Sequence, residues 1–234
     1  MASCVEHTTT IDESLEGMAS ANLSRAESWR VAIDMDGLVY LADSTVGLRA
    51  EEFAKKGCPR TNIDGLKFLK KHTIEDDRIV AIHDSALPGS KVGAYMLLHP
   101  FDGRILCLLA PNGQERQTLA ILVWGKGSKV TFYKGSHKLS VQPAPGDLME
   151  LSPEQLAVPS VTPVTISLKE GGFTIFDGRL GFTIIDGAAV TVVSAVPERL
   201  KKWKKLELPK LLELKNMVAG MSHSTIGFNF TFDD

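Results

Sequence analysis

Cysteine is scarce in this sequence, and long hydrophobic runs are missing. The three cysteines, Cys4, Cys58 and Cys107, are odd in number and form no C-x-x-C pair, which argues against a disulfide framework and against a structural zinc site. The longest apolar run, Leu119–Trp124, is far shorter than the roughly 20 residues that cross a bilayer. We therefore expect a cytoplasmic protein that does not enter a membrane.

An excess of charge of one sign is also missing. The 26 Lys and Arg residues nearly balance the 28 Asp and Glu residues, and the formal net charge is −2. This balance provides no general attraction for nucleic acid, which requires a basic surface. The stretch 1–23 is polar and lacks the apolar block of a signal peptide. We expect it to be a loose arm before a single domain over residues 24–234, which carries N-terminal helices and a C-terminal helical segment.

What the sequence does contain is a series of short apolar or alternating stretches. Gly, Pro, Asn and Asp separate them, which is typical of strands joined by turns. Strands are predicted over residues 38–42, 78–84, 93–99, 104–110, 118–124, 129–135, 163–168, 172–177, 181–186, 189–196 and 224–232. Asp186-Gly187 predicts a two-residue hairpin turn between two of these strands. So many short strands without long helices between them favour a barrel or sandwich over a doubly wound sheet.

Helices are predicted mainly at the two ends of the chain. The first begins near Ser24 and ends at the Asp36-Gly37 turn. Residues 47–57 and 63–72 have helical spacing of apolar side chains, and Gly57 is a stop signal. Residues 197–220 read as helical, with Pro209 starting a second segment.

One short stretch, VAIDMDGLVY, resembles the first motif of haloacid-dehalogenase-type phosphatases. That resemblance implies that Asp34 is a nucleophile at the tip of a buried strand and that Asp36 is an acid/base group. The phosphatase fold also requires alternating βαβ units, which the strand-rich second half lacks. The alternative is that both aspartates are turn residues before the strand 38–42.

Three longer stretches carry a broader resemblance. Residues 29–41, 119–138 (which end in GSHK) and 168–184 resemble the phytanoyl-CoA dioxygenase branch of the Fe(II)/2-oxoglutarate oxygenases. The resemblance covers most of the chain from Trp29 to Val196 and extends to small fungal proteins of this type. It implies a mainly β fold with flanking helices, namely a double-stranded β-helix, or cupin-like jelly roll.

The same resemblance implies an iron site that this sequence does not complete. Such sites use an H-x-D/E pair, a distant histidine, and an arginine about ten residues later that pairs with 2-oxoglutarate. The distant histidine position falls on Phe182, which has no lone pair for a metal. The first pair is degenerate, because His99 and Asp102 are separated by two residues instead of one. No Lys or Arg lies between Phe182 and Val196, and Arg199 comes too late. We therefore expect a vacant metal position, no metal and no cofactor.

The leading hypothesis is a non-catalytic oxygenase-like subunit. It would pair with an active homologous oxygenase, as in fungal secondary metabolism, or form a homodimer. A second hypothesis is a metal-free isomerase or cyclase, or a binder of a hydrophobic metabolite, that uses the same pocket. Its polar candidates are His99, Asp102, Lys138 and Arg179.

A third hypothesis keeps the iron chemistry with unorthodox ligands. His83 or His99 would combine with Asp102 and His223 to hold Fe(II), and 2-oxoglutarate would be the cosubstrate. His137 is not counted among the ligands, because the resemblance implies that the GSHK corner is structural. Under this hypothesis, 2-oxoglutarate lacks the arginine that normally pairs with its carboxylate.

Overall fold

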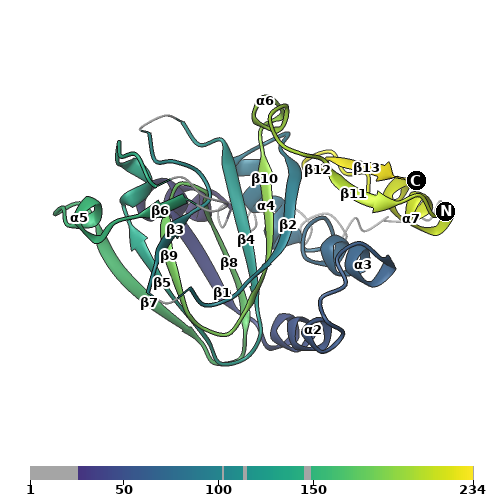
Figure 1. Cartoon of the computed structure of the whole chain (residues 1–234), viewed down its shortest axis with the longest axis horizontal. Helices are drawn as coiled ribbons and strands as arrows, with labels where there is room; N and C mark the ends of the chain where they lie inside the picture. Colours follow the sequence, from purple (N-terminus) through teal and green to yellow (C-terminus); the bar gives the residue numbers. More distant parts are fainter. Residues whose placement is uncertain (1–25, 102, 113–114, 145–148, 234) are drawn as a thin grey trace, which may run out of the picture.

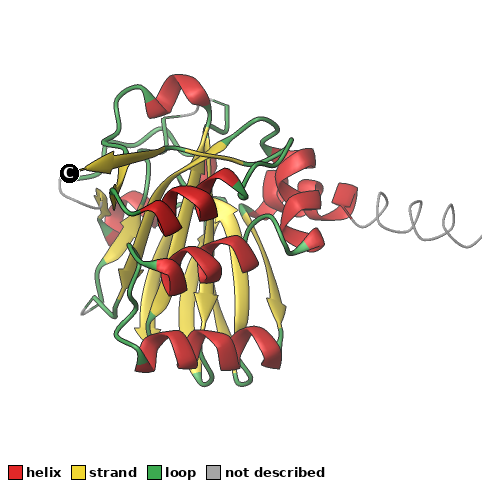
Figure 2. Cartoon of the chain, turned by 90° about the vertical axis from the view of Figure 1, so that its right-hand side faces the viewer, coloured by secondary structure: helices red, strands yellow, loops and turns green. Residues whose placement is uncertain are grey.

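The computed structural model describes residues 26–101, 103–112, 115–144 and 149–233. Two β-sheets face each other, and helices cover the outer face of the larger one (Figures 1 and 2). The larger sheet has the order β1 (Leu38–Ala42), β8 (Gly172–Asp177), β4 (Thr118–Trp124), β10 (Ala189–Ala195), β2 (Lys91–Leu98), β12 (Gly227–Phe228). The smaller has the order β6 (Met149–Leu151), β3 (Ile105–Cys107), β9 (Gly181–Asp186), β5 (Ser128–Lys134), β7 (Thr162–Leu168).

The chain crosses repeatedly between the two sheets. It passes from β2 to β3, from β4 to β5, and from β8 through β9 to β10, crossing to the facing sheet each time. Within these two sheets, neighbouring strands are antiparallel except for the short β12, which runs parallel to β2. This is the double-stranded β-helix, mainly β with flanking helices, that the sequence led us to expect.

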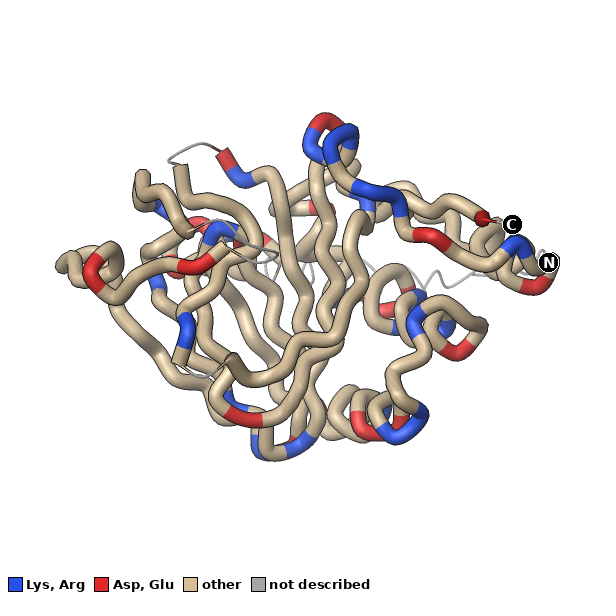
Figure 3. The backbone as a smooth tube through the Cα atoms, in the orientation of Figure 1, with Lys and Arg blue, Asp and Glu red and all other residues tan. Residues whose placement is uncertain are grey.

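Strand β4 shows why parts of the sequence read as unbroken apolar runs. All seven of its residues are buried. Ala120, Leu122 and Trp124 pack between the sheets, whereas Leu119, Ile121 and Val123 pack under the helices. A strand that is buried on both faces needs no polar alternation. Figure 3 shows the same distribution, with the charged residues concentrated in turns and helices and the central strands almost free of them.

The N-terminal helices form much as expected. A helix over residues 26–36 ends at Gly37, whose φ is +89°. Helix α2 (Ser44–Lys55) begins at Asp43, whose carboxylate accepts hydrogen bonds from the next backbone amides. Helix α3 (Ile63–Lys71) begins in the same way at Asn62. The predicted start near Ser24 and the stretch 1–23 lie outside the described residues.

The strand predicted over residues 78–84 is wrong. These residues belong to helix α4 (Asp77–Ala86). The Asp76 carboxylate accepts a hydrogen bond from the Arg78 amide and begins the helix, and Ile79, Ile82 and His83 are buried on one side. A short apolar run bounded by polar residues fits either element, and here the capping residue decides between them.

The hairpin predicted at Asp186-Gly187 is also wrong. Gly187 has the positive φ that such a turn requires, +81°. However, β9 lies in the smaller sheet and β10 in the larger one, so the turn connects two facing layers and the two strands do not pair. Local turn chemistry therefore identifies the bend without identifying the strand partners.

The C-terminal region is less helical than expected. It forms α6 (Pro197–Leu200), a strand β11 (Leu206–Pro209) and α7 (Leu212–Ala219). Pro209 thus ends a strand and does not start a helix. The expected closing strand is present as β12 and β13 (Phe230–Asp233), and β13 pairs in parallel with β11. Over the described residues, no helix is long and apolar enough to cross a membrane.

Candidate functional site

Phe182 lies at the start of β9 and is fully buried between the sheets. Its ring centroid is 5.3 Å from that of Phe176 on β8 and 6.2 Å from that of Phe132 on β5. Phe132 and Phe176 are themselves 5.2 Å apart. The three rings form a closed aromatic cluster that fills the interior at the position where the resemblance implies a metal ligand.

The strands beside Phe182 add further apolar side chains. Leu106 on β3 is paired with Phe182 and is 1% exposed. On β10, where the resemblance implies an arginine, Ala189 and Val193 face the same interior. Fe(II) requires nitrogen or oxygen lone pairs, and these side chains have none. In the described part of the chain, no group of three His, Cys, Asp or Glu side chains is arranged to hold a metal.

His99 lies outside this interior. His99 follows the last residue of β2 and is exposed. Asp102 lies outside the described residues. The strand position next to Phe182 belongs to Leu106. Leucine carries no signal that could have identified this position from the sequence.

The ligand set of the third hypothesis does not come together either. His83 is fully buried on α4, with its Nδ1 3.3 Å from Ser90 Oγ. His223 accepts a hydrogen bond from the Thr225 amide, close to where β12 pairs with the start of β2. His99 follows the opposite end of β2, about 25 Å away along a strand of this length.

We expect His83 to make the protein less stable in acid. Burial lowers its pKa from 6.5 to about 4. Between these two values the unfolded chain binds a proton that the folded chain excludes, so the free energy of unfolding falls by up to about 1.4 kcal/mol per pH unit as the pH drops. Urea denaturation from pH 7 to pH 4 measures the slope. His83→Gln removes this titration, and an unchanged slope in that variant would contradict the assignment.

Arg179, the remaining pocket candidate, lies in a cleft at the end of the barrel. The cleft has a volume of about 590 Å³. Four cationic side chains and two carboxylates line it, together with His137, Ser85 and Ala86; the charged residues are Arg30, Arg116, Lys138, Arg179, Asp34 and Glu115. Of the sequence candidates, the structure therefore brings Arg179 and Lys138 together and leaves His99 outside.

A chain of ion pairs holds one wall of this cleft. Asp177, fully buried at the end of β8, accepts hydrogen bonds from Arg179 Nε at 2.9 Å and Arg179 Nη2 at 2.7 Å. Arg116 Nε is 3.3 Å from the same carboxylate, and its Nη2 pairs with Asp34. Arg30 Nη1 is 3.1 Å from the other Asp34 oxygen. Sequence reasoning missed both as site residues, because Arg116 lies in no recognisable motif and Asp177 was interpreted as a turn residue before Gly178.

The phosphatase interpretation is wrong. Asp34 and Asp36 lie in the last turns of the helix over residues 26–36, whereas a nucleophile of that type lies at a strand tip. Asp34 pairs with two arginines, and Asp36 pairs with Lys134 at 2.7 Å. Both carboxylates thus have ion-pair partners, and both lie on a helix, whereas the alternative interpretation expected them in a turn.

One ring nitrogen of His137 makes a hydrogen bond. Its Nε2 is 3.3 Å from the carbonyl oxygen of Asp34, so Nε2 carries the proton and donates it. Nδ1 is buried and has no partner among the described residues. Burial lowers the pKa of His137, which keeps the ring neutral near pH 7. The cleft wall therefore contains a neutral imidazole beside a group of cations, and the unpartnered Nδ1 of this ring is buried against Gly37.

Gly37 allows this close approach. A Cβ at Gly37 would lie 2.5 Å from Leu180 Cδ1 and 2.7 Å from His137 Nδ1. We expect Gly37→Ala to destabilise the protein by about 1–2 kcal/mol from the positive φ alone, with a further cost from the clash. Gly127→Ala isolates the first contribution, because its φ is +75° and nothing lies within 4 Å of the added Cβ. Equal losses in both variants, measured by urea denaturation, would show that the contact with His137 is loose.

Comparison with protein-family models finds no match to this chain, and comparison with curated proteins finds none either. Solved structures do match. The epimerase SnoN in complex with Fe3+, alpha ketoglutarate and nogalamycin RO is 15% identical, with a TM-score of 0.52 over 74% of this chain and 84% of its own.

Two further solved structures agree with this match. EctD from S. alaskensis, solved with 2-oxoglutarate and 5-hydroxyectoine, is 14% identical, with a TM-score of 0.51 over 86% of this chain and 81% of its own. HygX from Streptomyces hygroscopicus is 11% identical, with a TM-score of 0.51 over 86% of this chain and 95% of its own. Identities this low establish the fold alone. The chain therefore has the double-stranded β-helix fold that is also found in these 2-oxoglutarate-bound enzymes.

Proposed function

We propose that this chain is a non-catalytic, oxygenase-like subunit that supports an active Fe(II)/2-oxoglutarate oxygenase. The observation that carries the proposal is the packing of Phe182 against Leu106, Phe132 and Phe176. Interlocking apolar side chains fill the interior at the position where the sequence resemblance implies a metal ligand. The retained fold and the apolar interior together favour a role as scaffold or partner over one in oxygen chemistry.

The surface offers a place for such a partner. Strand β1 is the edge of the larger sheet and has a strand neighbour on one side only, within the described structure. Tyr40 on this strand is 56% exposed, and Met35 on the preceding helix is 62% exposed. An unpaired edge supplies backbone hydrogen-bonding groups, and exposed apolar side chains beside it in the sequence supply contact area. A homologous oxygenase subunit fits this description best, and a second copy of the chain is the other candidate.

The setting we propose is the cytoplasm. Cys58 and Cys107 are free and buried, so neither forms a disulfide. Burial raises the pKa of Cys107 to about 12, which keeps its thiol protonated and unreactive. A role in fungal secondary metabolism rests on the sequence resemblance alone.

Iron stoichiometry tests the non-catalytic part of the proposal. We expect protein reconstituted anaerobically with Fe(II), with and without 2-oxoglutarate, to retain no iron above background after desalting. An active 2-oxoglutarate oxygenase treated in parallel is the positive control. About one tightly held iron per chain would overturn the proposal and favour an iron site with unorthodox ligands.

Association tests the partner part. We expect sedimentation velocity of the chain, alone and mixed with a homologous oxygenase from the same organism, to detect a complex in the mixture. Met35→Lys combined with Tyr40→Lys should abolish it. Leu212→Lys is the matched control, because Leu212 is 74% exposed on α7 and lies far from β1 in the sequence. A chain that stays monomeric with every such oxygenase tested would sink the proposal.

A second candidate function is metal-free binding or isomerisation of an anionic metabolite at the barrel-end cleft. It is favoured by the four cationic side chains that line this cleft together with His137. This site differs from the pocket expected from the sequence, whose interior is filled. Thermal shift with small carboxylates on wild type and on His137→Phe tests it. Equal stabilisation of both proteins would count against a role for the imidazole.

A further inference from the structure

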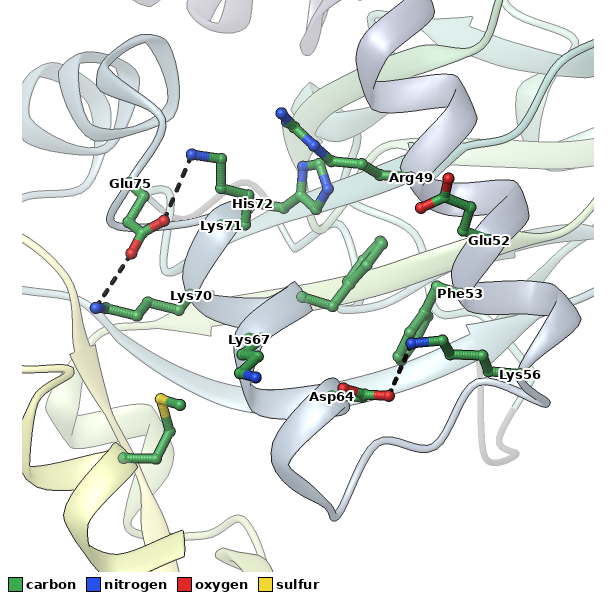
Figure 4. A pocket seen from close by; sticks show the side chains of 12 residues that line it. Arg49, Glu52, Phe53, Lys56, Asp64, Lys67, Lys70, Lys71, His72 and Glu75 are labelled. Carbon is green, nitrogen blue, oxygen red and sulfur yellow. Dashed lines mark hydrogen bonds and ion pairs between the residues drawn. The ribbon is translucent and has the colours of Figure 1, made fainter. Parts of the chain in front are cut away.

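A groove on the helical side of the molecule is separate from the barrel-end cleft. Residues of α2, α3 and the turn after α3 line it, and Met217 on α7 contributes one side. Its volume is about 420 Å³, within the range of about 300–1,000 Å³ that is typical of small-ligand sites. Figure 4 shows the groove with its apolar centre and its ring of charged side chains.

The floor of the groove is aromatic. The rings of Phe53 on α2 and Phe68 on α3 are stacked, with centroids 4.3 Å apart and planes inclined by 16°. The imidazole of His72, just after α3, lies against Phe68 with its centroid at 4.4 Å. The two phenylalanine rings face each other at the base of the groove, and the tilted ring of His72 lies at one end of the stack.

His72 is the polar group without a partner at this site. It is 1% exposed, and neither Nδ1 nor Nε2 has a hydrogen-bond partner among the described residues. Leaving a buried polar group unsatisfied costs about 1–3 kcal/mol, and native proteins rarely do so without a reason. Burial and the nearby Arg49 lower the pKa of His72 to about 4, so the ring is neutral near pH 7 and offers one donor and one acceptor.

The rim is basic, and part of its charge is uncompensated. Lys56 pairs with Asp64 at 2.9 Å. Lys70 and Lys71 both pair with Glu75, at 3.1 Å and 3.5 Å. The other two rim cations, Arg49 and Lys67, have no ion pair or hydrogen bond among the described residues, and the rim contains one further carboxylate, that of Glu52. Figure 4 shows Arg49 beside His72, so an unpaired guanidinium and an unsatisfied imidazole meet at one end of the aromatic floor.

We propose that this groove binds a small amphipathic carboxylate, such as a medium-chain fatty acid. The carboxylate pairs with Arg49, whose fork matches it bidentately, and accepts a hydrogen bond from His72. The hydrocarbon body lies over Phe53 and Phe68. Because His72 is 1% exposed, neighbouring side chains must move for a ligand to reach its ring, and a slender head group requires less movement than the backbone of a docked peptide helix. The proposal is independent of the oxygenase-like role of the barrel.

Titration calorimetry with octanoate and with 1-octanol tests the proposal. We expect saturable one-to-one binding of octanoate and at least tenfold weaker binding of the alcohol, which has the same chain without the charge. Arg49→Gln should weaken octanoate binding at least tenfold. Lys129→Gln, an exposed cation on β5 away from the groove, should leave it unchanged. Equal affinity of wild type and Arg49→Gln would overturn the proposal.

Two-dimensional NMR of the wild-type imidazoles provides a test that does not depend on any variant folding. Octanoate should shift the His72 ring resonances and leave those of His83 in place. Unshifted His72 resonances at saturation would overturn the assignment. So would failure of octanoate to bind at millimolar concentration while an acidic amphipathic peptide binds to the groove, because that result would make the groove a protein-docking site.

Discussion

Replacing Phe182 with alanine is expected to lower the free energy of unfolding by about 3–5 kcal/mol. The ring is fully buried and contacts two other phenylalanine rings between the sheets. Its removal leaves a cavity lined by side chains from three strands, and facing sheets cannot collapse to fill it without disturbing their pairing. Urea denaturation at constant pH measures the loss.

The control for this variant lies on the same strand. Ile185 is 46% exposed on β9, and Ile185→Ala should change the free energy of unfolding by no more than about 0.5 kcal/mol. A loss below about 1 kcal/mol in Phe182→Ala would mean that the interior is loosely packed, contrary to the aromatic cluster described above. The reverse change is informative as well. Phe182→His should bind no iron, because Leu106 lies beside the new imidazole and offers no second ligand.

Replacing Asp177 with asparagine is expected to have an effect of similar size, about 3–5 kcal/mol. The Asp177 carboxylate is fully buried and compensates two guanidinium groups, those of Arg116 and Arg179. An amide of the same shape keeps the packing but removes the buried negative charge that Arg116 and Arg179 share, and Arg116 keeps only its pair with the half-exposed Asp34 among the ion pairs described above. Because Arg179 is 7% exposed, water cannot replace the lost partner.

An exposed ion pair provides the comparison. Lys201 and Glu198 are 2.6 Å apart, with side chains 69% and 78% exposed. Glu198→Gln should cost less than about 1 kcal/mol, as is typical for surface pairs. High salt should also weaken the exposed pair more than the buried one. If Asp177→Asn and Glu198→Gln were equally stable, the ion-pair chain would not be holding the cleft wall.

Much of the fold could be predicted from local sequence patterns. The apolar run of β4, the apolar spacing of α2 and the Gly37 turn each depend on physical preferences that act over a few residues. The errors occurred where a pattern fits two structures. Residues 78–84 are apolar enough for a strand, yet Asp76 caps them as a helix. Asp186-Gly187 bends the chain as predicted, but hydrogen bonding to other strands decides which strands pair.

The candidate sites were less accessible from the sequence. The absence of a histidine at position 182 was visible without a structure, and so was the absence of a later arginine. The choice of His99 and Asp102 rested on residue type, and the structure places His99 at an exposed strand end instead. The partners that fill the interior, Leu106 above all, are ordinary apolar residues. Only the strand pairing, which places Leu106 opposite Phe182, shows that they line this interior.

The sequence by itself determined the class of fold and the lack of a recognisable iron-ligand set, because alternation, turn residues and side-chain lone pairs are local properties. The tertiary structure alone decided which residues share a site. Arg116 meets Asp34 and Asp177 across long stretches of chain, and Arg49 meets His72 across two helices. Such contacts arise when sheets and helices pack to bury their apolar faces. No local sequence pattern predicts which distant residues this packing brings together.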